Sequence, residues 1–456
     1  MKLDRLAALC LMLAIAPVLF AMETTAPHWT IVAIALVAAY IAICLRRTGF
    51  AARMMLGAAI LTSALYVMLG GTASGFIQVV RQTIYLPVLI GVLVPLRVVA
   101  MEAEMVKRAG HFVVDQPPSR RFALLAIGGQ IFGVLLNVGG LLILLHVALR
   151  GPMARGPDDK VAALQTRRIT IAVMRGFGAN IFWSPLGLGL NLLLTLMPTL
   201  TWTEFAPYGL AASVVFIAIG WLVDRLQSPP PPVARKAEAS GEGWSLVGLL
   251  AILAVISGGA ALIETIFGLP LRGAILVIVP LFAVGWQLAV RSAERAPYQA
   301  LGELLDKTVR ALPGASNEIT IIASAGYLGL LIAAMIPHDA VSQLALGLGL
   351  DGGLLAVAIC LLVLASSLAG LNPMIASTIS VKAVVSAGLA ISEPLLVLSV
   401  LVGWALALVV SPATSTLAIA SSVTRKPQST VGLRWNGAFC LAVLIVAMVI
   451  FLEIWP

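Results

Sequence analysis

The chain has 456 residues, of which 60% are hydrophobic and only 11% are charged. A soluble globular protein carries about 25% charged residues, so this sequence is too apolar to form a polar surface around a core. The formal net charge of +9 is explained by basic loops beside a membrane, and no nucleic-acid partner is expected. The composition predicts a polytopic membrane protein in contact with the lipid bilayer, and all-α in class because helices satisfy their own backbone groups in lipid.

Apolar runs of about the 20 residues that cross a bilayer follow one another along the chain. The first run follows Lys2 and Arg5 as in a signal peptide, but no small-x-small cleavage site follows it, so we interpret it as a helix. We therefore predict about eleven transmembrane helices. They are residues 6–22, 29–45, 55–72, 83–100, 169–197, 207–226, 244–264, 271–291, 317–336, 394–420 and 436–454.

Lysine and arginine gather in alternate loops, which marks the cytoplasmic side of a membrane. Basic loops include residues 46–53 and 150–168, whereas residues 23–28, 198–206 and 337–343 carry little positive charge. This alternation predicts a multi-pass protein of a bacterial-type inner membrane, with a cytoplasmic N-terminus and a periplasmic C-terminus.

Two apolar runs do not fit the alternation of the loops. Run 122–149 has basic residues at both ends, and run 354–387 has charge-poor loops on both sides. Each is interrupted at its middle, by Asn-Val-Gly-Gly at 137–140 and by Gly-Leu-Asn-Pro at 370–373, where a helix breaks and the chain can reverse. We predict two re-entrant hairpins that enter from opposite sides. The alternative is a pair of short, tilted spans in each place.

The two halves of the chain repeat one pattern in opposite orientations. Each hairpin is followed by a span with Ser-Pro at its middle, Ser184-Pro185 and then Ser411-Pro412, 227 residues further on. Such an inverted repeat is typical of secondary transporters that bind their substrate near the midplane. The predicted organisation is an extra first helix (1–28), an N-terminal repeat (29–226, with hairpin 122–149 and broken helix 169–197), a cytoplasmic linker (227–243) and a C-terminal repeat (244–456, with hairpin 354–387 and broken helix 394–420).

This pattern resembles the ion transporter superfamily, which includes divalent-anion symporters and arsenite-permease-like proteins. The resemblance covers most of the chain and concerns architecture more than motif. It implies a site built from residues 137–140, 183–187, 370–373 and 411–416, a homodimer, and a domain that moves like an elevator. Divalent-anion symporters usually carry Ser-Asn-Thr at the hairpin tips, where this chain has Asn-Val-Gly-Gly and Leu-Asn-Pro-Met.

The second half of a broken helix exposes backbone N–H groups that favour an anion, and unwound carbonyls suit a small cation. We therefore expect a secondary active transporter of a small, anionic solute, with Na+ or H+ as the coupling ion and no other cofactor. An efflux permease or antiporter of the same fold is the alternative, ahead of a membrane-embedded enzyme. The candidate substrate-binding residues are Asn137, Gly139, Gly140, Ser184, Pro185, Asn372, Pro373, Ser411, Thr414 and Ser415. Their other interpretation is that they merely satisfy freed backbone groups.

Few charges lie inside the apolar runs. Arg175 precedes Ser184 by about 13 Å of helix, and Lys382 follows Asn372 by about 15 Å. The simplest interpretation is that both side chains snorkel to the membrane edge, and the alternative is that they steer an anion. Glu318 is expected at the end of a span. The four cysteines are far apart, and no metal ligands can be assigned from their spacing.

Overall fold

The computed structural model describes residues 2–24, 26–155, 159–227, 243–291 and 296–455, and every regular element among them is helical. Ten helical stretches, some of them made of consecutive helices, are long and apolar enough to cross a membrane. The number rises to eleven if one bent pair of helices is counted as one span. The predicted all-α polytopic membrane fold is confirmed. The predicted linker 227–243 lies almost entirely outside the described residues.

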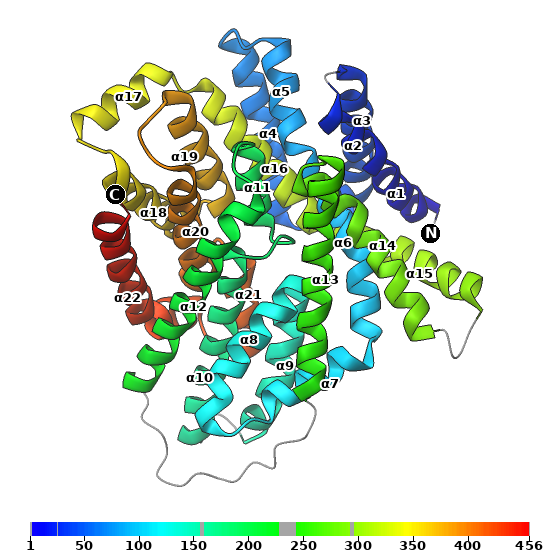
Figure 1. The fold of residues 1–456 in the computed structure, drawn as a ribbon, viewed down its shortest axis with the longest axis vertical. Helices are drawn as coiled ribbons and strands as arrows, with labels where there is room; N and C mark the ends of the chain where they lie inside the picture. Colours follow the sequence, from blue (N-terminus) through cyan, green and yellow to red (C-terminus); the bar gives the residue numbers. More distant parts are fainter. Residues whose placement is uncertain (1, 25, 156–158, 228–242, 292–295, 456) are drawn as a thin grey trace.

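The first half of the chain contains twelve α-helices and two short 3-10 helices (η1 and η2), drawn from blue to green in Figure 1. They are α1 (Lys2–Leu13), α2 (Ile15–Glu23), α3 (Pro27–Cys44), η1 (Leu45–Arg47), α4 (Phe50–Met68), α5 (Ala73–Thr83), α6 (Tyr85–Glu102), α7 (Glu104–Val114), α8 (Pro118–Leu136), α9 (Val138–Ala154), α10 (Lys160–Ala179), η2 (Asn180–Phe182), α11 (Leu188–Leu196) and α12 (Trp202–Gln227).

The second half contains ten α-helices, one 3-10 helix (η3) and two short π-helices (η4 and η5), drawn from green to red. They are α13 (Gly243–Phe267), α14 (Leu271–Arg291), α15 (Pro297–Ala311), η3 (Leu312–Ala315), α16 (Ser316–Met335), α17 (His338–Gly347), α18 (Gly352–Leu368), α19 (Pro373–Ala387), α20 (Glu393–Val410), α21 (Ser415–Thr424), η4 (Thr430–Arg434), α22 (Trp435–Val449) and η5 (Ile450–Ile454).

Helices α8 and α9 form an antiparallel pair that turns at Asn137. This residue has φ +51° and ψ −137°, a positive-φ conformation that residues with a side chain adopt rarely. The pair is tight at its tip, because an added Cβ on Gly140 would lie 2.1 Å from the Phe132 carbonyl oxygen. The chain therefore reverses within run 122–149, where the sequence predicts a break.

Helices α18 and α19 form a second antiparallel pair. Gly370 at its turn has φ +101°, which glycine adopts without strain, and Pro373 begins α19, where its missing N–H has no helical partner to lose. At the open end, the Gly352 amide donates to the Ala390 carbonyl at 2.9 Å. The chain thus also reverses within run 354–387.

The packing of the two hairpins follows one scheme. Helix α8 packs along α10, and α18 packs along α20. Across the halves, α11 contacts α19 and α21 contacts α9. Each hairpin thus packs on the first half of its own broken helix and on the second half of the other one.

The helices fall into two groups, which we call the core group (α8–α12 and α18–α22) and the outer group (α1–α7 and α13–α17). In the outer group, α6 packs on α14, α4 on α16 and α13 on α14. The two groups meet chiefly where α16 lies along α19 and α7 lies against α8. In Figure 1 the core helices α10, α12, α20 and α22 lie to the left, and α1–α3, α14 and α15 lie to the right.

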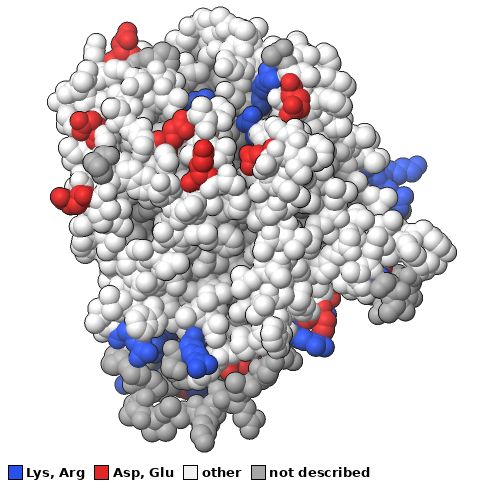
Figure 2. Space-filling view, viewed as in Figure 1, with Lys and Arg blue, Asp and Glu red and all other residues white. Residues whose placement is uncertain are grey.

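Charged side chains lie mainly at the two ends of the molecule. Figure 2 shows a broad white band between a lower end with many Lys and Arg side chains and an upper end with most of the visible Asp and Glu. The white band corresponds to the apolar belt that a bilayer covers. The lower end contains α7 and also the beginning of α10, which falls in the basic loop 150–168 that the sequence predicts to be cytoplasmic.

Candidate functional site

The first broken helix unwinds between η2 and α11, around the predicted residues Ser184 and Pro185. Both are buried, and the Ser184 Oγ accepts a hydrogen bond from the Leu186 amide at 3.2 Å. The Asn191 side chain donates to the carbonyls of Pro185 and, at 3.0 Å, of Gly187. The polar groups that this break frees are thus largely satisfied within the chain.

Two aromatic side chains tie this break to its surroundings. The Tyr85 hydroxyl of α6 donates to the Asn191 Oδ1 at 2.9 Å, so an outer helix holds the side chain that caps the break. The Trp202 indole donates to the Trp183 carbonyl at 3.0 Å. The first break is therefore a rigid element, braced from the outer group through Tyr85 and from α12 through Trp202.

The second broken helix unwinds between α20 and α21 with the same local geometry. The Ser411 Oγ accepts from the Ala413 amide at 3.1 Å, as Ser184 accepts from Leu186. The Ser411 hydroxyl donates to the Ser367 carbonyl at the tip of the second hairpin, at 2.6 Å. The Thr414 hydroxyl donates to the Ser411 carbonyl at 2.8 Å. The break and the tip of its own hairpin are thus in direct contact.

Buried hydroxyl groups without a partner distinguish the second break from the first. Within the described residues, the Ser367 Oγ and the Thr416 Oγ1 are buried and make no hydrogen bond. Ser367 is 0% and Thr416 is 1% exposed. A buried hydroxyl without a partner costs about 1–3 kcal/mol, so each of these groups calls for a partner such as a bound water or ion.

The asparagines at the two hairpin tips make different hydrogen bonds. The Asn137 side chain donates a hydrogen bond to the Glu318 carboxylate at the start of α16. That carboxylate also accepts hydrogen bonds from the two terminal nitrogens of Arg97 on α6, at 3.1 and 3.3 Å. The Asn372 Oδ1 caps α19 by accepting from the Met374 amide at 2.9 Å. The first tip is therefore attached to the outer group, whereas the second asparagine closes its own turn.

The other predicted site residues divide by exposure. Gly140 and Pro373 are buried, whereas Gly139 and Ser415 are exposed. Gly140 is required by the close approach of α8, and Pro373 occupies the first turn of α19, where proline is favoured. Many of the predicted side chains thus satisfy backbone groups or shape the turns. Backbone groups are therefore the principal candidates for direct contact with a solute.

The electrostatics of this region come from its helices. Four helices, α9, α11, α19 and α21, begin at a hairpin tip or a break, and each has nine or more residues. A helix N-terminus carries about half a positive charge and offers backbone N–H groups that have no partner in the helix. The arrangement can therefore bind an anionic group without a charged side chain.

The expectation that Arg175 snorkels to the membrane edge is wrong. Its side chain is 0% exposed, donates to the Asn436 Oδ1 at 3.0 Å and to the Gly220 carbonyl at 2.8 Å, and lies 4.3 Å from the Phe439 ring centre. A third contact reaches the Trp435 carbonyl at 3.4 Å. Arg175 thus clamps α10 to α12 and α22, which a sequence without contacts could not reveal.

Sequence reasoning missed Asn191 and Tyr85 and placed Glu318 at a span end without a partner. Asn191 lies six residues after Pro185, on the first turn of the second half-helix, where an amide can reach back to freed carbonyls. That spacing was a usable signal. No sequence signal indicates that Glu318, 181 residues from Asn137, meets the hairpin tip.

No protein-family model and no curated protein sequence matches the chain. Among solved structures, its fold is similar to that of MtrF from Neisseria gonorrhoeae, described as one of a class of antimetabolite efflux pumps. The TM-score is 0.53 at 16% sequence identity, and the match covers 83% of this chain and 84% of MtrF. The chain is a multi-pass membrane protein with the fold of a membrane transporter.

Proposed function

We propose that the chain is a secondary active transporter of a small anionic solute, and that the solute binds between the two hairpin tips and the two breaks. The observation that carries the proposal is the set of four helix N-termini at those points, since an N-terminus inside a protein favours negative charge. Helix α11 contacts α19, and α21 contacts α9. Each of these contacts therefore joins a helix that follows a break in one half of the chain to a helix that follows a hairpin tip in the other half.

A coupling cation is proposed beside the second break. The Ser367 and Thr416 hydroxyls lack partners there, and oxygen ligands without a carboxylate suit a monovalent ion such as Na+. The first break offers less, because Asn191 and Trp202 already occupy the carbonyls of Pro185, Gly187 and Trp183. H+ is the alternative coupling ion.

The proposal includes an elevator-like movement of the core group against the outer group. It also includes membership of the ion transporter superfamily, assembly as a homodimer, and an orientation with the basic end in the cytoplasm. The packing of the hairpins and broken helices supports the elevator-like movement, because these elements contact one another across the two halves and could move together. The hydrogen bonds from Asn137 to Glu318 and from Tyr85 to Asn191 join the two groups, and both would have to break and re-form as the core moves.

Export is the second candidate function, favoured by the fold that the chain shares with MtrF, an efflux pump. Uptake and export use the same site and differ in the gradient that drives the cycle. The direction is therefore decided by flux measurements with the gradient imposed in each sense, and both outcomes are compatible with the proposed site.

Flux into proteoliposomes tests the function. The purified chain should move radiolabelled small anions, with succinate, sulfate and acetate as probes, under an imposed Na+ or H+ gradient. At least one probe should accumulate or be expelled against its own gradient, and protein-free liposomes should show neither. A folded, reconstituted protein that moves no anion under either gradient in either direction would contradict the proposal.

A further inference from the structure

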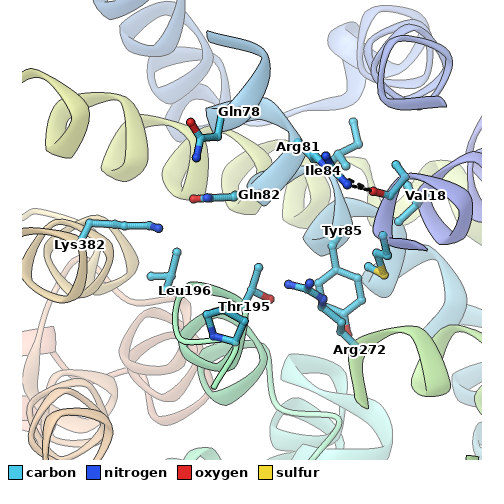
Figure 3. Close-up of a pocket in the computed structure, with 13 residues that line it drawn as sticks. Val18, Gln78, Arg81, Gln82, Ile84, Tyr85, Thr195, Leu196, Arg272 and Lys382 are labelled. Atoms are coloured by element: carbon cyan, nitrogen blue, oxygen red, sulfur yellow. Dashed lines mark hydrogen bonds between the residues drawn. The ribbon is translucent and has the colours of Figure 1, made fainter. Parts of the chain in front are cut away.

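A second polar feature lies outside the region of tips and breaks. It is a cavity of about 340 Å³ between the outer and core groups, within the size range of small-molecule sites. Its outer wall comes from α2, α5, α6 and the start of α14, and its core wall from the end of α11 and the middle of α19. Figure 3 shows these walls facing one another across the cavity.

Three cationic side chains line the cavity, namely Arg81, Arg272 and Lys382, and no carboxylate is among its lining residues. In Figure 3 Arg81 and Arg272 lie on one side and Lys382 on the other, with its amine directed toward the space between them. Two cations thus belong to the outer group and one to the core group. Positive groups in a partly enclosed cleft concentrate anions far more than on an open surface.

The three cations differ in how far they are already satisfied. Arg81 donates to the carbonyls of Ala21, at 2.7 and 3.0 Å, and of Thr24, at 2.5 Å. Arg272 and Lys382 have neither an ion pair nor a hydrogen bond to any described residue, and the Arg272 Nε is buried without a partner. Both side chains are half-buried, so an anion would replace water at two cations that form no ion pair with a described residue.

Uncharged donors complete the lining. Gln78, Gln82 and Thr195 lie around the cations, and the buried Tyr85 forms part of the wall. Tyr85 also holds Asn191, which caps the first break, so this wall is directly connected to the proposed transport site. Lys382 follows Asn372 by ten residues, which places it about 15 Å along α19 from the second hairpin tip.

We propose that this cavity is a distinct binding site for a small anion with two negative charges, held between Arg272 and Lys382 with Arg81 beside them. Two carboxylates of one solute, or one sulfate or phosphate group, would meet a cation from each wall. A bound anion would bridge the outer and core groups, because the cations that hold it belong to different groups. The site stands apart from the transport proposal, since equilibrium binding does not require that the anion be transported.

The same chemistry could come from a soluble dianion or from the phosphate of an anionic lipid. Calorimetric titration of the full-length protein in detergent separates these sources. The probes are succinate, inorganic phosphate and acetate, together with a short-chain phosphatidylglycerol. Succinate or phosphate should bind about tenfold more tightly than acetate, because one more charge-assisted contact is worth about that factor. Added salt should weaken the binding.

Substitutions locate the binding. Lys382→Gln and Arg272→Gln should each weaken dianion binding about tenfold and reduce the preference over acetate. Lys107→Gln is the matched control, because that exposed lysine lies on α7 at the other end of the molecule. If Arg272→Gln does not fold, Lys382→Gln carries the test alone. A lipid that displaces succinate, with both weakened by Lys382→Gln, would support the site with a headgroup as occupant.

Two results would overturn the site. One is the absence of measurable binding of succinate, phosphate and the lipid to folded wild-type protein. The other is dianion binding that Lys382→Gln leaves unchanged, since the anion would then bind elsewhere. Anion flux that persists in either case would leave the transport proposal intact, so the two proposals can fail separately.

Discussion

Replacing Arg175 with leucine is expected to lower the yield of correctly folded protein sharply. The substitution leaves the Asn436 Oδ1 and the carbonyls of Gly220 and Trp435 buried without their donor, and the Phe439 ring without its cation. Each unpaired acceptor costs about 1 kcal/mol or more, so the loss is roughly 3 kcal/mol of a stability that rarely exceeds about 15 kcal/mol. Fluorescence-detected size-exclusion chromatography after detergent extraction measures the folded fraction.

Two other variants isolate the cause. Arg175→Lys keeps a charge but loses the planar fork that reaches three acceptors, so an intermediate yield is expected. Lys382→Gln removes a half-buried cation without protein contacts and should leave the yield unchanged. A normal chromatographic profile and melting temperature for Arg175→Leu would show that the buried contacts are not needed to hold α10 against α12 and α22.

Alanine at two adjacent glycines should have opposite effects. An added Cβ on Gly140 would lie 2.1 Å from the Phe132 carbonyl oxygen and 2.6 Å from its carbon, where real contacts stay above 3.0 Å. The tip of the first hairpin would have to open, which costs at least the 1–3 kcal/mol or so typical of overpacking, and transport should be lost. The same change at Gly139 meets nothing within 4 Å.

Gly139→Ala is therefore the matched control, with the same chemistry at the next residue of the same helix turn. It should retain expression and flux, and a slight gain in stability is expected because alanine restricts the unfolded chain more than glycine does. Equal flux in the Gly140→Ala and Gly139→Ala proteins would show that transport does not require the close approach of α8 and α9 at this tip.

The membrane fold and the two chain reversals could be predicted because they depend on local rules. Lipid requires long apolar runs, and an Asn-Val-Gly-Gly or Gly-Leu-Asn-Pro segment breaks such a run wherever it occurs. Asn137 and Gly370 do have the positive φ angles that those segments allow. Positions of helices follow from such patterns, whereas the partners of side chains depend on which helices meet.

The contacts of the candidate site could not be predicted for that reason. Arg175 looks like a snorkelling residue on its own helix, and it becomes a clamp because Asn436, 261 residues away, lies beside it. The cavity between the groups likewise combines Arg81, Arg272 and Lys382 from three distant segments. Among the serines, the sequence correctly marked the breaks but could not tell that Ser184 and Ser411 are engaged in their own turns.

The apparent transport constant of tip variants tests the central claim, that the solute binds between the hairpin tips and the breaks. Asn137→Ala removes an amide at the first tip, and Asn372→Ser changes the second tip while keeping a residue that caps α19. In protein that still folds, each should raise the constant about tenfold, because each changes a tip whose backbone N–H groups are proposed to hold the solute, and one hydrogen bond in a membrane interior is worth about 1–2 kcal/mol. Gln343→Ala, exposed on α17, should change nothing. Normal constants in both asparagine variants would place the solute elsewhere and leave the repeat as architecture alone.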